Sequence, residues 1–284
     1  MSDRNIATPF SLLHSVSLLS QRSRIKKFAT AIERAVNADS YVVDLGAGSG
    51  ILSLLSAKAG ARKTTAVEIN KESASYAKQA ARMNGLENKV DFFEGHFQDF
   101  IPTEKADVVI CEMLSSMMLI EQQVPAAKHA VKEVLKEGGL LLPHKITIYS
   151  CLVQCDSVWN RFSVEELDFP KMPQTVSRDA IIELSDLSIL SKIDLMKIPD
   201  DFKIDVTIDY KIVEDGIIHG IVGMFEAELS EGIIINMEDG WQELFIPLDQ
   251  SLQVSKNDII SMRMKYIPGD LHSLSLHVDK RFEQ

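Results

Sequence analysis

Residues 41–50 decide the fold, and they read Tyr41-Val42-Val43-Asp44-Leu45-Gly46-Ala47-Gly48-Ser49-Gly50. An apolar run ends at Asp44, glycines follow at alternate positions, and an apolar, amphipathic run occupies residues 51–59. This order predicts a strand, a tight glycine turn and a helix. Glycine lets a backbone come close to a ligand, and the amino terminus of a helix attracts polar ligand groups. The stretch therefore predicts a binding site for a nucleotide-like cofactor.

Two kinds of cofactor compete for this turn. The dinucleotide pattern G-x-G-x-x-G needs a glycine where this chain has Ile51. Asp44 would repel a pyrophosphate, whereas an amino-acid moiety that carries an ammonium would tolerate it. The pattern D-x-G-x-G-x-G resembles motif I of the class I S-adenosylmethionine methyltransferases. S-adenosylmethionine is the favoured cofactor, with NAD or FAD, or a glycine turn without a ligand, as alternatives.

A second acidic residue supports a nucleotide-like ligand. Glu68 ends the next apolar run, 18 residues after Gly50. An acid at this place accepts hydrogen bonds from ribose hydroxyls in both cofactor families. We expect Asp44, Gly46, Gly48, Gly50 and Glu68 to bind the cofactor.

Composition limits the remaining possibilities. A chain of 284 residues with 45% hydrophobic and 25% charged residues is ordinary globular material, long enough for about two domains at ~150 residues each. The net charge of −11 argues against a nucleic-acid partner and favours cationic or neutral substrates. We also expect no signal peptide and no membrane span, because no apolar run approaches ~18 residues. Three cysteines without metal-ligand spacing predict buried thiols in a reducing cytoplasm and no metal site.

From Tyr41 to Pro143, short strand-like runs alternate with longer helix-like runs. This alternation predicts a parallel sheet covered by helices. We expect Asn84-Gly85 and Gly138-Gly139 to end two of the helices. The expected strands are 41–45, 64–69, 89–93, 106–111 and 140–142, and the expected helices are 51–59, 71–83 and 122–136. Ligands bind at the carboxyl ends of such strands.

After Pro143 apolar residues recur at every second position, most clearly over residues 204–212. We expect an antiparallel β-barrel or sandwich, with hairpin-type dipeptides at Asp215-Gly216 and Asp239-Gly240. The fold class is therefore α/β: a Rossmann-like domain followed by a β-barrel-like domain. The predicted division is an N-terminal helical segment over the cofactor site (1–40), a cofactor-binding domain (41–143) and a substrate domain (144–284). Residues 156–190 show no readable pattern.

Three segments make the chain resemble the protein arginine methyltransferases. Residues 111–121, Cys-Glu-Met-Leu-Ser-Ser-Met-Met-Leu-Ile-Glu, resemble that family's double-glutamate loop, which implies that Glu112 and Glu121 hold the substrate. Residues 18–28 resemble the family helix whose arginine, here Arg24, binds the cofactor carboxylate. Residues 95–98 resemble the loop that holds the adenine, which implies roles for Phe97 and for Gln98, where the family has Glu.

The chemistry of the two glutamates can be stated apart from the resemblance. A guanidinium is a poor nucleophile, because its electrons are delocalised and its pKa exceeds ~12. Two carboxylates would fix its plane and direct electron density to the attacking nitrogen. Glu121 could instead serve only the dipole of a helix that begins there. Arg24 taken alone could be a solvated helix charge.

The chain departs from the family pattern at the substrate end. Met113 and Ser116 stand where the family has aromatic residues, so Met113 could line the substrate slot or pack in the core. The family's T-H-W loop resembles Asp239-Gly240-Trp241, in which Trp241 is kept and glycine replaces histidine. Asp239 could supply a carboxylate there. The resemblance also implies a homodimer, but residues 156–190 show no helical dimerisation arm.

The sequence thus predicts an S-adenosylmethionine-dependent N-methyltransferase acting on a guanidino or other cationic nitrogen, in a protein or a small molecule. Two alternatives stay open. One is a methyltransferase for RNA or a small-molecule amine on the same scaffold. The other is a cofactor-binding regulatory protein that has lost turnover, for which Gly240 is the best argument.

Overall fold

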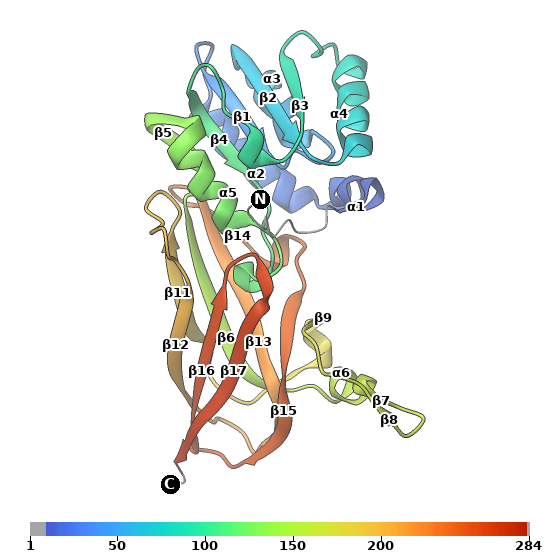
Figure 1. Cartoon of the computed structure of the whole chain (residues 1–284), viewed down its shortest axis with the longest axis vertical. Coiled ribbons are helices and arrows are strands. Elements are labelled where there is room, and N and C mark those ends of the chain that lie inside the picture. The colour runs from blue at the N-terminus through green and yellow to red at the C-terminus, as the bar shows by residue number, and fades with distance from the viewer. Residues whose placement is uncertain (1–9, 283–284) are drawn as a thin grey trace.

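The structure is a computed structural model that describes residues 10–282. A five-stranded, all-parallel sheet forms one end of the molecule, and antiparallel sheets form the other (Figure 1). The parallel strands lie in the order β3-β2-β1-β4-β5. Their bounds are β1 Tyr41–Leu45, β2 Lys63–Glu68, β3 Val90–Glu94, β4 Ala106–Cys111 and β5 Leu135–Leu142. The order reverses between β1 and β4, where ligands bind in sheets of this kind.

The helices of this half agree with the sequence except near β5. They are α1 Leu12–Ser17, α2 Arg22–Ala35, α3 Ile51–Lys58, α4 Lys71–Met83 and α5 Gln123–His129, with short 3-10 turns η1 Leu18–Ser20 and η2 Phe97–Asp99. The predicted end of α4 is confirmed, since Gly85 has a φ of 64° and Leu86 N–H donates to the Ala81 carbonyl.

The predicted helix over 122–136 is wrong in its second half. After α5 the chain makes one π turn, η4 Ala130–Val134, and β5 begins at Leu135. Gly138-Gly139 does not end a helix. Gly138, with a φ of 72°, lies in an excursion within β5, because Leu135 pairs with Ala106 and the next paired residue is Leu140. A left-handed glycine permits such a bulge as readily as a helix end.

The second half is antiparallel, as predicted. One sheet has the order β10-β6-β13-β15-β9, with β11 on β6 and β14 on β13; a second has the order β12-β16-β17. The bounds are β6 Lys145–Gln154, β9 Gln174–Val176, β10 Ile182–Glu183, β11 Ser188–Asp194, β12 Ile204–Lys211, β13 Gly216–Ser230, β14 Ile233–Asn236, β15 Glu243–Val254, β16 Ile259–Ile267 and β17 Asp270–Phe282. The change from parallel to antiparallel pairing falls between β5 and β6, beside the predicted boundary at residues 143 and 144. The division into domains stays a prediction, and residues 1–9 of its first segment lie outside the described residues.

Both predicted hairpin dipeptides are wrong. Asp215-Gly216 joins β12 to β13, but β12 pairs with β16 and not with β13. Asp239 is the last residue of the 3-10 turn η7 Met237–Asp239, Gly240 follows it, and both β14 and β15 pair with β13. These dipeptides permit a sharp change of direction, but strand partners are chosen by tertiary packing.

Short elements between residues 156 and 180 project beside β15 (Figure 1). They include α6 Asp156–Trp159, η5 Asn160–Phe162, β7 Ser163–Val164, β8 Leu167–Asp168 and η6 Arg178–Ala180. No long helix occurs here, in agreement with the sequence. Among the described residues, no helix is long and apolar enough to span a membrane.

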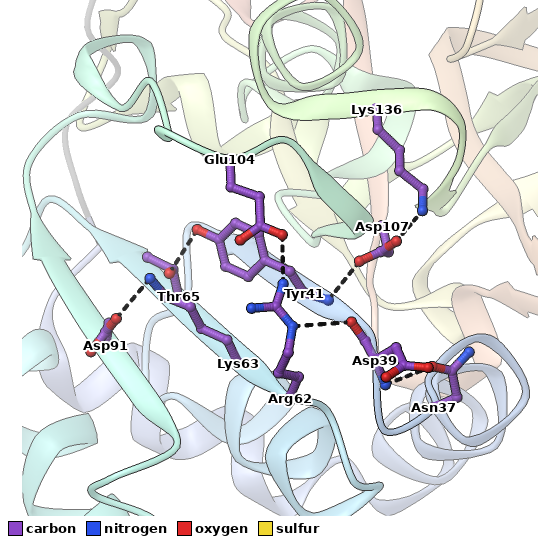
Figure 2. Close-up of polar contacts among 10 residues, drawn as sticks. All are labelled: Asn37, Asp39, Tyr41, Arg62, Lys63, Thr65, Asp91, Glu104, Asp107 and Lys136. Carbon is purple, nitrogen blue, oxygen red and sulfur yellow. Dashed lines mark hydrogen bonds and ion pairs between the residues drawn. The ribbon is translucent and has the colours of Figure 1, made fainter.

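The amino-terminal edge of the parallel sheet is closed by polar contacts (Figure 2). The Asp107 carboxylate accepts a hydrogen bond of 2.7 Å from Tyr41 N–H and pairs with Lys136. Arg62 pairs with Glu104 at 2.6 Å, and the Tyr41 and Thr65 hydroxyls lie 2.9 Å apart. This edge is tied together by its own side chains, which leaves the opposite edge for a ligand.

Candidate active site

A cavity of about 710 Å³ lies at the carboxyl edge of the parallel sheet. Its wall combines the glycine turn after β1, the end of β2, the loop after β4, helices α1 and α2, and the residues that precede β15. Helices α1 and α2, together with η1 between them, cover this side of the sheet, since Ser15, Leu18 and Arg24 all line the cavity.

The glycine turn has the predicted close-packed form. Gly46 and Gly48 have φ values of 76° and 54°, in the region that favours glycine, and both line the cavity. A Cβ on Gly46 would lie 3.0 Å from Met113 Cγ. Gly50 differs, because it begins α3 outside the cavity wall and a Cβ there would lie 2.7 Å from Ala77 Cβ. The structure thus gives Gly50 a packing role and does not bring it to the cofactor end.

Asp44 and Glu68 are both buried at the end of the cavity that the glycine turn lines, where the sequence predicts the cofactor. Burial raises the pKa of Asp44 to about 6, although Ser53 donates a hydrogen bond of 2.6 Å to its carboxylate and so opposes the rise. The two Glu68 carboxylate oxygens accept from Gly48 N–H and Asn70 N–H, each at 2.7 Å. Glu68 therefore fixes the glycine turn and can still offer lone pairs to a ligand.

Arg24 lies between groups that the sequence assigns to the substrate. Its guanidinium is paired with the Glu112 carboxylate, and its Cζ lies 4.3 Å from the centre of the Trp241 ring. The Trp241 ring is held in turn by a hydrogen bond of 2.9 Å from its Nε1 to the Leu114 carbonyl. Burial lowers the pKa of Arg24 to about 10, against the attraction of Glu121 and Asp239. Arg24 therefore remains charged at neutral pH.

Glu121 lies in the wall of the same cavity. Burial raises its pKa to about 7, and the positive charge of Arg24 opposes this rise. The Ser115 hydroxyl accepts hydrogen bonds from Ile120 N–H and Glu121 N–H, at 3.3 and 3.1 Å. The loop after β4 thus turns back on itself and brings both predicted glutamates to one cavity. Their roles in binding a substrate stay predictions.

The adenine loop is only partly as predicted. Phe97 is buried and lines the cavity, but Gln98 is exposed and outside the wall. His96, which the sequence did not single out, lines the cavity, and its Nδ1 accepts from Gln98 N–H at 3.2 Å. The structure therefore does not bring the Gln98 side chain to the cofactor. A histidine that caps a short helical turn leaves no spacing signal in the sequence.

The substrate-end residues separate into two groups. Met113 and Trp241 line the cavity, whereas Asp239 is buried behind it. The Asp239 carboxylate accepts hydrogen bonds from Ser23, Lys27 and Asn236 N–H, so it joins η7 to α2. Because three protein donors occupy its carboxylate, Asp239 is not placed to contact a substrate directly.

Gly240 has a structural reason to be glycine. Its φ is 117°, and a Cβ would lie 2.0 Å from Gln21 Oε1. The Gln21 side chain thus fills the space beside Trp241 that a residue larger than glycine would need. Gln21 lines the cavity and lies within residues 18–28, the segment that resembles the family helix, although the sequence gave it no role. The wall residues Gln122, Thr175 and Gln242 come from separate elements and gave no sequence signal.

The three cysteines are buried and unpaired, as predicted. Within the described part of the chain, no group of three or more His, Cys, Asp or Glu residues could hold a metal ion. The cavity thus has the glycine turn with Asp44 and Glu68 at one end, and two acids, an arginine and an indole at the other.

The chain is similar to known proteins over its first half and, in several cases, over most of its length. The ribosomal protein L11 methyltransferase (PrmA) family profile matches residues 28–143. An uncharacterized protein of Methanocaldococcus jannaschii is 36% identical over 183 residues, which are 59% of this chain and 70% of that protein. Protein arginine N-methyltransferase 1 of Chlamydomonas reinhardtii is 24% identical over 268 residues, 86% of this chain and 77% of that protein.

Solved structures match the whole architecture. The Trypanosoma brucei PRMT1 enzyme–prozyme heterotetrameric complex with AdoHcy superposes with a TM-score of 0.78 and 22% identity, covering 94% of this chain and 95% of that one. Protein arginine methyltransferase 10 of Arabidopsis thaliana gives a TM-score of 0.74 and 20% identity, over 89% of this chain and 87% of that chain. At these identities the match shows the fold: a Rossmann-like sheet joined to a β-barrel.

Proposed function

This chain belongs to a protein arginine methyltransferase-like family and is an S-adenosylmethionine-dependent methyltransferase, and we propose that it methylates a guanidino nitrogen of arginine in a protein. The cofactor supplies a methyl group on a positively charged sulfur. The residues present fit that group, because Gly46 and Gly48 form a cradle without side chains and Asp44 suits an ammonium. Arg24, Glu68 and Phe97 are the other residues we propose to hold it.

One observation supports arginine above other acceptors. The substrate end already contains a guanidinium, that of Arg24, paired with Glu112 and stacked on Trp241. A carboxylate and an aromatic face are the two partners that a planar guanidinium prefers. The same groups would accept a substrate guanidinium once Arg24 turns toward the cofactor carboxylate.

The two acids account for the chemistry of transfer. Glu112 and Glu121 would hold the guanidinium plane and place one nitrogen at ~3–3.5 Å from the methyl carbon. The nitrogen gains the methyl group and loses one proton. Glu121 lines the same cavity and is the group we propose to accept that proton, which becomes far more acidic as the new bond to carbon forms. The wall beside the acids includes the apolar side chains of Met113, Leu114 and Ile120, and such low-polarity surroundings strengthen each charge interaction.

The acceptor is tested by incubating the protein with a methyl-labelled cofactor and a cell extract. The expected result is label that protease releases and ribonuclease does not, and that acid hydrolysis recovers in methylated arginine. The Glu112→Gln variant is the matched control and should transfer no label. Label in RNA, in lysine or in small molecules would contradict the proposal. Tight cofactor binding without any transfer would support the regulatory alternative.

The location and the oligomeric state of the protein are also part of the proposal. We propose a cytoplasmic location, supported by the buried, unpaired cysteines, and a homodimer, supported by the family resemblance. Size-exclusion chromatography with light scattering measures the mass of the assembly, and a homodimer should give twice the mass of one chain. A net charge of −11 supports a protein acceptor rather than a nucleic acid.

A further inference from the structure

Gln123 is a buried polar residue beside the two acids that neither the family resemblance nor the proposed mechanism uses. It is the first residue of α5, its exposed fraction is 0%, and it lies behind the cavity wall. Its Nε2 makes no hydrogen bond of good geometry among the described residues, and the side chain lies beside the Cys111 thiol, where it opposes the rise that burial causes in the pKa of that thiol. A buried amide without a hydrogen bond at one end lowers the stability of the fold. The contact made by its other end is therefore of interest.

The other end of the amide binds the loop between the glutamates. Gln123 Oε1 accepts a hydrogen bond of 2.8 Å from Met113 N–H. Met113 directly follows Glu112, and Gln123 comes two residues after Glu121. One side chain therefore connects the backbone next to the first acid with the backbone next to the second.

The other contacts of this loop hold different parts of it. Ser116 Oγ donates to the Gln242 carbonyl at 2.6 Å, and Tyr266 donates to the Met117 carbonyl at 2.8 Å. These bonds attach the tip of the loop to the antiparallel half. Nearer to the first acid, the Glu112 carboxylate pairs with Arg24 and the Leu114 carbonyl accepts from Trp241 Nε1. Between these two contacts, the Met113 backbone N–H is held by Gln123.

Met113 also connects this bond to the cofactor end. Its Cγ lies 3.0 Å from where a Gly46 Cβ would be, so its side chain packs directly on the glycine turn. A shift of the Met113 backbone would move Glu112 and loosen this contact together.

We propose that Gln123 is a positioning residue that sets the place of Glu112 relative to Glu121. It touches neither cofactor nor substrate, and it acts through the Met113 amide. The inference rests on the proposed function for its catalytic consequence, but the hydrogen bond itself can be tested without any acceptor.

The central test is Gln123→Met, which keeps the side-chain volume and removes the acceptor oxygen. Hydrogen exchange followed by mass spectrometry, on the protein with S-adenosylhomocysteine, should show at least about tenfold faster exchange at the Met113 amide. Gln253→Met is the matched control, because Gln253 Nε2 donates to the Gly216 carbonyl away from the cavity. Unchanged exchange at Met113 would overturn the proposal.

The catalytic consequence is measured with the peptide acetyl-Ala-Ala-Arg-Ala-Ala-amide and its lysine counterpart. Gln123→Met should lower kcat/KM for the arginine peptide by about 10- to 100-fold and leave the dissociation constant of S-adenosylhomocysteine within about threefold. Gln123→Met should also raise the dissociation constant of the arginine peptide in the wild-type background. In the Glu112→Gln background it should not raise this constant, because its effect passes through Glu112. Equal weakening in both backgrounds would overturn the positioning role.

The two proposals fail in different ways. If the wild-type protein neither binds nor methylates the arginine peptide, the proposed acceptor is wrong, and the exchange measurement alone decides the role of Gln123. If wild type methylates the peptide and Gln123→Met does so equally well, the positioning role is wrong. Gln123→Asn, which withdraws the oxygen by one methylene, should behave like Gln123→Met and guards against a variant that does not fold.

Discussion

The two edges of the parallel sheet use charge in opposite ways. At the amino edge, Arg62 and Glu104 pair with 45% and 58% of their side chains exposed (Figure 2). At the carboxyl edge, Arg24 and Glu112 pair with only 9% and 12% exposed. The exposed charges stay close to water, whereas burial raises the pKa of Asp44 to about 6 and that of Glu121 to about 7.

This difference distinguishes structural charges from candidate functional ones. Exposed pairs contribute ~0–1 kcal/mol each, since water screens them. A buried acid with a raised pKa destabilises the folded protein when it is charged. Such acids occur at functional sites, where a bound ligand supplies the opposite charge. The carboxyl edge is therefore where we expect substitutions to affect binding and transfer rather than stability.

The largest effect is expected from Glu112→Gln. Loss of one carboxylate from the acceptor end should lower kcat by about 10²- to 10³-fold and leave cofactor affinity unchanged. Single-turnover transfer and calorimetric titration of S-adenosylhomocysteine measure the two quantities. Normal turnover in this variant would remove the proposed mechanism, and a melting curve checks that the protein is folded.

Glu68→Ala tests the cofactor end of the same edge. It removes the acceptor for Gly48 N–H and Asn70 N–H as well as the proposed ribose contacts. At ~1.5–3 kcal/mol for each charged hydrogen bond, the cofactor dissociation constant should rise at least about tenfold. Cofactor affinity equal to that of wild type would show that Glu68 serves only the turn.

The pKa of Glu121 predicts a pH dependence of acceptor binding. Below its pKa of about 7 the carboxyl is neutral, so binding a guanidinium must release a proton. The dissociation constant of the arginine peptide should fall about tenfold per pH unit between pH 5 and 7 and then level off. Titration in buffers of different ionisation enthalpy measures the proton, and Glu121→Gln should abolish the dependence.

The same raised pKa has the opposite effect on the unliganded protein. A carboxyl whose folded pKa is raised contributes stability below its unfolded pKa of ~4.5 and loses it as the pH rises through about 7. Acceptor binding should therefore raise Tm more at pH 8 than at pH 5. An equal rise at both values would contradict the assignment to Glu121.

The smallest effect is expected at the amino edge. Arg62→Ala removes the pair with Glu104 and a bond of 3.2 Å from Arg62 Nε to the Asp39 carbonyl. It should lower the free energy of unfolding by less than about 1 kcal/mol and leave methyl transfer unchanged. Chemical denaturation and the transfer assay measure both; loss of transfer would mean that the two edges are coupled.

The parallel half was predictable because its signals are local. The strand, glycine turn and helix of residues 41–58 lie within one continuous segment, and the predicted ends of α4 and β4 agree with the structure. The predictions at Gly138 and Asp215-Gly216 were wrong because they also rested on local signals alone. A glycine states that the chain can turn, but its neighbours in space decide whether a helix end, a bulge or a linker results.

The candidate site was only partly predictable. Asp44, Glu68 and Glu112 follow from one rule, because the carboxyl ends of neighbouring parallel strands meet at one edge. Gln98 and Asp239 were placed by resemblance, and here their side chains lie outside the cavity wall. Gln21 and His96 lie in segments that resemble the family, but the sequence gave neither a role. Gln123 gave no signal, because it matters through its own burial and its bond to Met113.

The sequence by itself determined the cofactor cradle and the presence of two acids after β4, because short-range backbone geometry and strand order follow from residue pattern. Only the tertiary structure decided that Arg24 lies on Glu112 and Trp241, that Gln21 fills the space beside Gly240, and that Gln123 holds Met113. These contacts join residues from separate elements. Their existence depends on how buried surfaces pack, which no local pattern records.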